Sequence, residues 1–228
     1  MKKFYFLFLV IVFCSLIVVS CSDNTYVLLK NNISEIREKL YTYRDEEIYV
    51  NLMTGQRESD YLANGVSTPK INFAKINLQF YDQNYKYNER KVDYTVEIDG
   101  VSYSGAMLNN PYDNSFVVDL GIKIDNDESI IINFTIDNSV KNVELTLTNA
   151  DWKINAYTAL EVVGNDLREY IQQFVENNSL KAEVFIKIVY QGNYNNWFWH
   201  IQIVSENGAK LSEIIDINNG EIISKNIQ

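Results

Sequence analysis

The chain has 228 residues and a formal net charge of −10, with 20 Lys and Arg against 30 Asp and Glu. This acidic balance argues against nucleic acid or an anionic lipid surface as a partner, because both are bound by Lys and Arg that neutralise phosphates. The chain has one histidine and two cysteines, which excludes zinc sites built from several His or Cys ligands.

Residues 1–20 have the layout of a secretory signal peptide. Lys2 and Lys3 supply positive charge, and an apolar run over residues 4–19 follows them. A membrane-spanning helix needs about 20 apolar residues, so this run is short for a permanent anchor. We therefore expect residues 1–20 to be removed.

The end of the leader, Val18-Val19-Ser20-Cys21, resembles the lipobox of bacterial lipoproteins, in which an aliphatic, a variable and a small residue precede a cysteine. The resemblance implies that Cys21 carries lipid and becomes the first residue of the mature chain. The protein would then sit on the extracytoplasmic side of a membrane in the bacterial envelope. The alternative is a plain signal anchor with an incidental cysteine.

Residues 21–44 are expected to form a lipidated tether that includes a short helix. Within this segment apolar residues recur at spacings of three and four, as on one face of an amphipathic helix. These residues are Ile33, Ile36, Leu40 and Tyr43. The predicted helix covers residues 31–43.

Residues 45–149 are a succession of short strands separated by turn residues, which is typical of a β-sandwich. The clearest local signal is Asp99-Gly100, because this pair tolerates the positive φ angles of a two-residue hairpin turn. Apolar residues occupy every second position before it: Val92, Tyr94, Val96 and Ile98. We predict an antiparallel β-sandwich-like domain here.

Residues 150–228 change to one helix followed by a meander. Apolar residues follow helical spacing from Ala156 to Val175, with Asp151 as the expected N-cap. Four strand-like runs separated by turns follow. The predicted fold class of the whole chain is therefore α+β, in which the sandwich-like domain precedes a helix and a four-stranded antiparallel meander.

This last third resembles the PepSY-type domains of extracytoplasmic bacterial proteins. The matching features are a helix with Ala159-Leu160-Glu161, a strand over 184–190, a Trp-bearing strand, and a closing aliphatic-Asp-x-x-x-Gly-x-aliphatic turn. Ile215, Asp216, Gly220 and Ile222 match that turn. The resemblance implies binding or modulation of proteases and envelope partners, and not catalysis.

Two aromatic groups are candidate binding surfaces. In "NWFWHIQIV" alternate side chains share a face, so Trp197 and Trp199 are expected in the core while Phe198 and His200 lie opposite. Those two residues would form a binding platform or pack under a neighbouring domain. The other group is an exposed patch able to stack on sugars or peptides, although such residues more often pack on strands. Its members are Tyr81, Tyr85 and Tyr87.

Asp125, Asp127 and Glu128 are oxygen ligands of the type that calcium prefers. They lack the glycine and the distal glutamate of the twelve-residue calcium loop, so a solvated turn is the favoured interpretation. We predict no metal site and no cofactor.

The chain contains no nucleophile elbow, phosphate loop, zinc-protease helix or dinucleotide fingerprint. We therefore expect a non-catalytic binding or interaction module, with the membrane bound through Cys21 and an envelope protein or peptide as partner. One alternative is a solute- or glycan-binding lipoprotein that uses Tyr and Trp faces. Another is a hydrolase that uses His200 or a pair of carboxylates.

Overall fold

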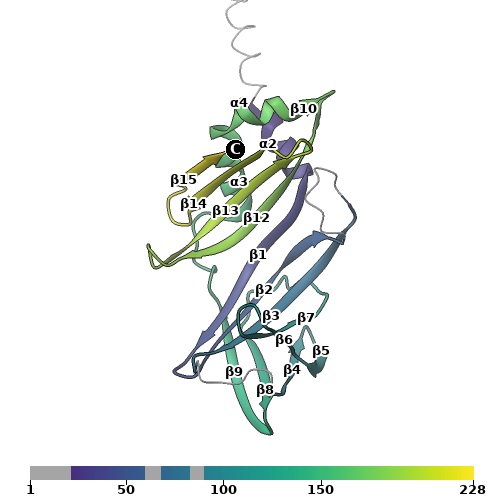
Figure 1. Ribbon diagram of the computed structural model, residues 1–228, viewed down its shortest axis with the longest axis vertical. Helices are drawn as coiled ribbons and strands as arrows, with labels where there is room; N and C mark the ends of the chain where they lie inside the picture. The colour runs from purple at the N-terminus through teal and green to yellow at the C-terminus, as the bar shows by residue number, and fades with distance from the viewer. Residues whose placement is uncertain (1–21, 60–67, 83–89) are drawn as a thin grey trace, which may run out of the picture.

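The structure is a computed structural model that describes residues 22–59, 68–82 and 90–228. In these ranges it is mostly antiparallel β-sheet with three short helices (Figure 1), which confirms the α+β class at that level. Cys21 and the leader lie outside the described residues. None of the helices in the described ranges is long and apolar enough to cross a membrane.

Strand β1 (Ile33–Arg44) lies at the centre of the molecule (Figure 1). One edge pairs antiparallel with β2 (Ile48–Glu58) along almost the whole strand. The other edge is divided between two partners. Its first residues pair in parallel with β12 (Ala182–Gln191), and Tyr41 and Thr42 pair antiparallel with β9 (Ser139–Leu147). The same strand therefore belongs to both halves of the fold.

The predicted helix over residues 31–43 is wrong, because that segment is β1. The helix lies earlier, as α2 (Ser22–Asn31), where Leu28 and Leu29 are buried. The pairing of β1 shifts register after Ile33 and again after Arg37, and both of its faces are partly buried. A strand of this kind buries apolar residues three and four apart, which imitates a helical period.

The first half has two sets of strands around one core. From β2 the sheet continues through β3 (Lys70–Phe80) and β7 (Ser115–Asp119) to β6 (Leu108–Asn110). From β9 it continues through β8 (Ile130–Ile136) and β4 (Val92–Ile98) to β5 (Val101–Ala106). The predicted hairpin is confirmed, since Asp99 and Gly100 join β4 to β5 with φ of 51° and 76°.

In the second half, β12, β13 (Asn196–Ser205), β14 (Lys210–Asp216) and β15 (Ile222–Ile227) pair antiparallel in succession. Buried residues of α2 and α3 (Ala156–Asp166) share a core with one face of these strands. Shorter elements follow α3: α4 (Arg168–Ile171), a 3-10 turn over Gln172–Phe174, and the pair β10 (Val175–Glu176) and β11 (Ser179–Leu180).

The cap of α3 differs from the expected one. The Asn155 side chain accepts hydrogen bonds from the N–H groups of Tyr157 and Thr158 at 3.0 and 2.9 Å, whereas Asp151 lies four residues earlier in the exposed connection. Just before this cap, Ile154 donates its N–H to Ile217 O at 3.0 Å, which ties the entry of the helix to the residue that follows β14.

Candidate functional site

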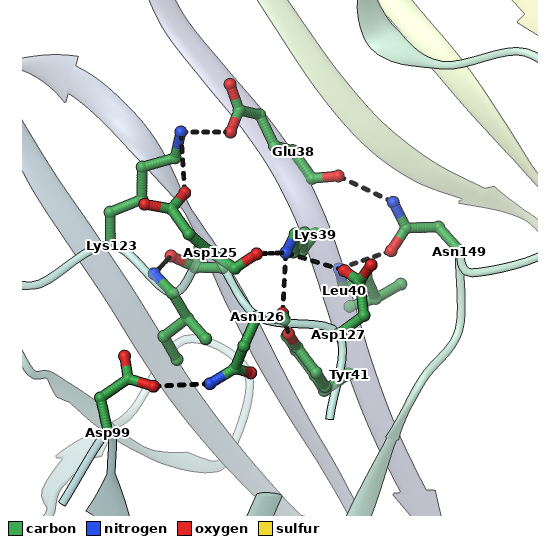
Figure 2. Close-up of polar contacts among 12 residues, drawn as sticks. Glu38, Lys39, Leu40, Tyr41, Asp99, Lys123, Asp125, Asn126, Asp127 and Asn149 are labelled. Carbon is green, nitrogen blue, oxygen red and sulfur yellow. Dashed lines mark hydrogen bonds and ion pairs between the residues drawn. The ribbon is translucent and has the colours of Figure 1, made fainter. Parts of the chain in front are cut away.

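The two cores meet beside the middle of β1, where Asn149 takes the place of a neighbouring strand. Its Nδ2 donates to Glu38 O at 2.7 Å and its Oδ1 accepts from Leu40 N at 3.1 Å (Figure 2). The ladder with β12 ends at Ile36 and the ladder with β9 begins at Tyr41. One side chain therefore satisfies backbone groups of β1 that neither strand reaches.

The connection over residues 120–129 is held against β1 by Lys39 (Figure 2). Lys39 Nζ donates to the backbone oxygen atoms of Asp125 and Asn126, the latter at 2.7 Å, and lies 2.8 Å from Asp127 Oδ1. Tyr41 OH also donates to Asn126 O at 2.6 Å. Burial, together with the carboxylates of Asp127 and Asp99, raises the pKa of Tyr41 to about 12.

This arrangement explains what the acidic segment does. Of the carboxylates that were candidate calcium ligands, that of Asp127 pairs with the Lys39 ammonium at 2.8 Å and that of Asp125 pairs with Lys123 at 3.2 Å. In the described ranges no three His, Cys, Asp or Glu side chains are placed to hold a metal ion. The side chains of Asp125 and Asp127 are exposed, as expected of a turn, while the backbone between them is bound to β1.

A cavity of about 210 Å³, the junction cavity, lies next to this network. Its walls come from β1, from the connection after β9, from the start of α3 and from β13. The lining residues include Glu38, Asn149, Trp152, Asn155, Tyr157 and Trp199. Trp152 meets Trp199 edge to face with ring centroids 5.5 Å apart, and Trp199 Nε1 donates to Ile154 O at 2.7 Å. Two tryptophan rings in contact therefore form part of the cavity wall.

Glu38 is the carboxylate of the junction cavity. Its Oε2 lies 2.6 Å from Lys123 Nζ, and its Oε1 accepts from Tyr157 OH at 3.4 Å. Burial, and then the Glu38 charge, raise the pKa of Tyr157, so the hydroxyl stays a donor. The cavity offers aromatic surface, a paired carboxylate and a hydroxyl. Aromatic faces and hydrogen-bonding groups of this kind are those that contact small polar rings in binding sites.

The structure places the predicted aromatic residues of β13 in two environments. Trp199 is buried in the second core and Trp197 packs against that core, as predicted. Phe198 is not an exposed platform, because it is only 2% exposed and packs against the ring of Tyr194. His200 is partly buried beside Lys187, and burial followed by the Lys187 charge lowers its pKa. A lysine neighbour is not the carboxylate partner that orients a catalytic histidine.

The predicted tyrosine patch is described only at Tyr81. Its ring is 40% exposed, and its OH accepts a hydrogen bond from Arg44 Nε at 2.6 Å. Tyr85 and Tyr87 lie outside the described residues.

A larger cleft of about 720 Å³ lies at the far end of the first half, between the turns after β1 and β8. The charged groups on its rim hold the turns together. Lys141 pairs with Asp45 at 2.8 Å and Glu47 at 2.6 Å, and Arg90 lies 3.3 Å from Asp137. Glu47, Arg90, Asp137 and Lys141 line the cleft, so these four charges are already neutralised in ion pairs across it.

A close pair of carboxylates does exist, between Asp166 at the end of α3 and Glu213 on β14. Glu213 is 1% exposed, and Lys225 bonds Asp166 and lies 3.8 Å from Glu213 Oε1. Burial, and then the neighbouring Asp166, raise the pKa of Glu213 to about 8. Glu213 belongs to the face of β14 that packs under the helices, so it is a core group and not part of the junction cavity.

Sequence reasoning missed Glu38, Trp152 and Tyr157. An isolated tryptophan in a polar connection was the available signal, since Trp152 follows a strand and precedes the helix. Nothing in the spacing connects it to Glu38.

Comparison with models of protein families, with curated proteins and with solved structures finds no match. The geometry of the molecule and its leader are therefore the basis for a functional proposal.

Replacement of Lys39 tests the network around β1. Lys39→Met removes the ammonium donor from the backbone oxygen atoms of Asp125 and Asn126, of which Asn126 O keeps the Tyr41 hydroxyl. The net contribution of such a hydrogen bond to stability is about 0.5–1.5 kcal/mol. We expect the free energy of unfolding in urea to fall by that amount. Lys75→Met, at an exposed position on β3, should change it by less than about 0.5 kcal/mol. Equal effects would show that Lys39 is an ordinary surface residue.

The raised pKa of Glu213 predicts a pH dependence of stability. Because the folded state holds the proton up to about pH 8, its stability should fall as pH rises from the ordinary glutamate range through 8. Glu213→Gln keeps the neutral form, so the difference in melting temperature between the variant and the natural protein should grow from pH 5 to pH 9. The exposed Glu128→Gln should show no such trend, and parallel profiles for all three proteins would contradict the assignment.

Proposed function

We propose that the chain is a non-catalytic binding protein of the bacterial envelope, held on the extracytoplasmic side of a membrane by a lipid on Cys21. The leader with its Ser20-Cys21 end supports this anchoring. Helix α2 begins at Ser22, directly after the cysteine, and its Leu28 and Leu29 are buried in the second core. A lipid on Cys21 would hold the α2 end of the body close to the membrane, in place of the tether with a short helix expected over residues 21–44.

The proposal includes a finer description of the two halves. Residues 45–149 form a β-sandwich-like unit, supported by the two sets of strands around one core. Residues 150–228 form a PepSY-like unit, supported by α3 on a four-stranded meander and by the closing turn. In that turn Gly220 donates its N–H to Asp216 O at 3.1 Å and has a φ of 75°. Both units share β1, so they would act as one rigid body.

The junction cavity is the observation that carries the binding function. The Glu38 carboxylate accepts from the Tyr157 hydroxyl and pairs with Lys123, so its charge is held in place in the cavity wall, which favours recognition over proton transfer. Clefts and cavities for drug-sized ligands span roughly 300–1,000 Å³, and the junction cavity, at about 210 Å³, has the size of one small ring. A terminal sugar of a glycan fits this chemistry, because aromatic walls pack on its apolar face while polar groups bind its hydroxyls.

Lipid attachment is tested by replacing each cysteine separately. Cys21→Ser should abolish incorporation of labelled palmitate and release the protein from the membrane fraction. Cys14→Ser is the matched control, since Cys14 lies in the leader, and it should leave both unchanged. Membrane retention and labelling of Cys21→Ser at the natural level would refute the anchor.

Sugar binding is tested with N-acetylglucosamine and glucose as probes, by intrinsic tryptophan fluorescence of the full-length protein in uncharged detergent. We expect a saturable change reported by Trp199, and Trp152→Ala should weaken binding about tenfold, which corresponds to about 1.4 kcal/mol. Tyr112→Ala removes a ring that is 96% exposed elsewhere, so it should have no effect.

The circular dichroism of Trp152→Ala must match that of the natural protein for this comparison to hold. Absence of a fluorescence change with either sugar would contradict recognition of a sugar ring in the junction cavity.

A further inference from the structure

Strand β5 is an edge of the first half, at the margin of the molecule (Figure 1). It pairs with β4 from Ile98↔Val101 to Asp93↔Ala106, and β4 is its only partner in the described ranges. Every residue of β5 except Tyr103 is exposed. Its outer edge is therefore open to another chain.

The hydrogen-bonding pattern between β4 and β5 shows which backbone groups of β5 point outward. Met107 donates its N–H to Val92 O at 2.8 Å. Bonded and non-bonded positions alternate in an antiparallel pair, so the bonded residues of β5 are the odd-numbered ones. The N–H and C=O groups of Ser102, Ser104 and Ala106 point away from β4. They form a regular row that an extended chain can pair with.

Natural edge strands are usually protected by charged side chains, proline, bulges or short length. The sequence of β5, VSYSGA, has no charge and no proline, and its pairing with β4 has no register shift. The other edges differ: β6 has only three residues, and β15 carries Lys225, which bonds Asp166. The edge of β5 thus lacks the protection found on β15.

The two faces beside this edge have different chemistry. Ser102, Ser104 and Ala106 are small and lie opposite Glu97, Thr95 and Asp93 of β4. Glu97 is exposed, and Asp93 lies 3.3 Å from Lys91. On the face toward the core, Val101 is 52% exposed. An added strand would meet the Glu97 carboxylate and the Asp93–Lys91 pair on one face and apolar surface on the other.

We propose that β5 accepts an extended segment of a partner protein as an additional strand, with basic residues alternating with apolar ones. Neighbouring strands lie about 4.8 Å apart, and β5 lies between the added strand and β4. The added strand is therefore roughly 10 Å from β4, which carries Glu97. Long Lys or Arg side chains cross that distance over the small residues of β5. The apolar residues between them pack beside Val101. Backbone pairing supplies affinity, and this alternation supplies specificity.

A second copy of the chain is disfavoured as the occupant. Pairing of β5 with itself would place two acidic faces in one sheet and would supply no basic side chain. The inference deepens the proposed function, since it rests on the protein being a binding module, but it uses a different face from the junction cavity.

The test uses two fluorescein-labelled decapeptides, one alternating Lys and Val and the other alternating Glu and Val. Binding to the full-length protein in uncharged detergent is followed by fluorescence anisotropy. The Lys/Val peptide should bind, more weakly as salt rises from 50 to 300 mM, and the Glu/Val peptide should not. Binding should slow hydrogen exchange at the amides of Ser102, Ser104 and Ala106. Equal binding of both peptides, or protection elsewhere only, would overturn the proposal.

Two matched pairs of variants locate the contact. Ser104→Pro removes an outward N–H without removing a bond to β4 and should weaken binding at least tenfold, while Ser104→Thr should not. Glu97→Gln should weaken binding several-fold, whereas Glu144→Gln, on the distant strand β9, should leave it unchanged. If circular dichroism shows that the Ser104→Pro protein is unfolded, the comparison of Glu97→Gln with Glu144→Gln decides whether the peptide binds beside β5.

Two further measurements separate this inference from other outcomes. Trp152→Ala should bind the Lys/Val peptide normally. A failure of sugar binding would therefore not contradict the β5 site, and a failure of peptide binding would not contradict the junction cavity. A dimer that is detected by sedimentation and lost in Ser104→Pro would overturn the choice of occupant.

Discussion

The hydrogen bonding of β1 is the constraint on which the rest of the molecule depends. The strand pairs with β2 on one edge and with β12 and β9 on the other, and it contributes Ile36 and Leu40 to one core and Tyr41 to the other. Its contact with β2 is close, because a Cβ on Gly55 would lie 1.9 Å from Ile36 O. Only glycine lets β2 follow β1 past the register shift there. The two halves are thus coupled through one strand, and not joined by a flexible linker.

This arrangement creates the junction. Between Ile36 and Tyr41 neither β12 nor β9 reaches β1, so the backbone at Glu38 and Leu40 is satisfied by the Asn149 side chain. Lys39 and Tyr41 then bind the backbone of the connection over 120–129. The contacts of Asn149, Lys39 and Tyr41 therefore serve first to hold the fold together. The junction cavity lies where the connection to α3 runs beside β1.

How much of this could be predicted from the sequence depends on how local each signal is. The Asp99-Gly100 hairpin and the core face of β13 follow from residues adjacent in the chain, and both were predictable. Strand β1 was not predictable, because its two register shifts and the burial of both its faces remove the alternation of apolar and polar residues that marks a strand. The junction cavity joins Glu38, Trp152 and Trp199, which are far apart in sequence and are brought together only by the crossing of β1. The burial of Phe198 also depends on tertiary packing that no local pattern contains.

The acidic charge of the chain links its surface chemistry to the exposed edge of β5. An unprotected edge strand normally invites pairing between identical copies. A net charge of −10, with Glu97 exposed on the strand next to that edge, makes two copies repel each other. The same charges attract a basic segment. Charge on the neighbouring strand therefore discriminates between partners, so β5 itself can remain uncharged and free for backbone pairing. Protection placed on β5 directly would prevent aggregation and would also remove the binding site.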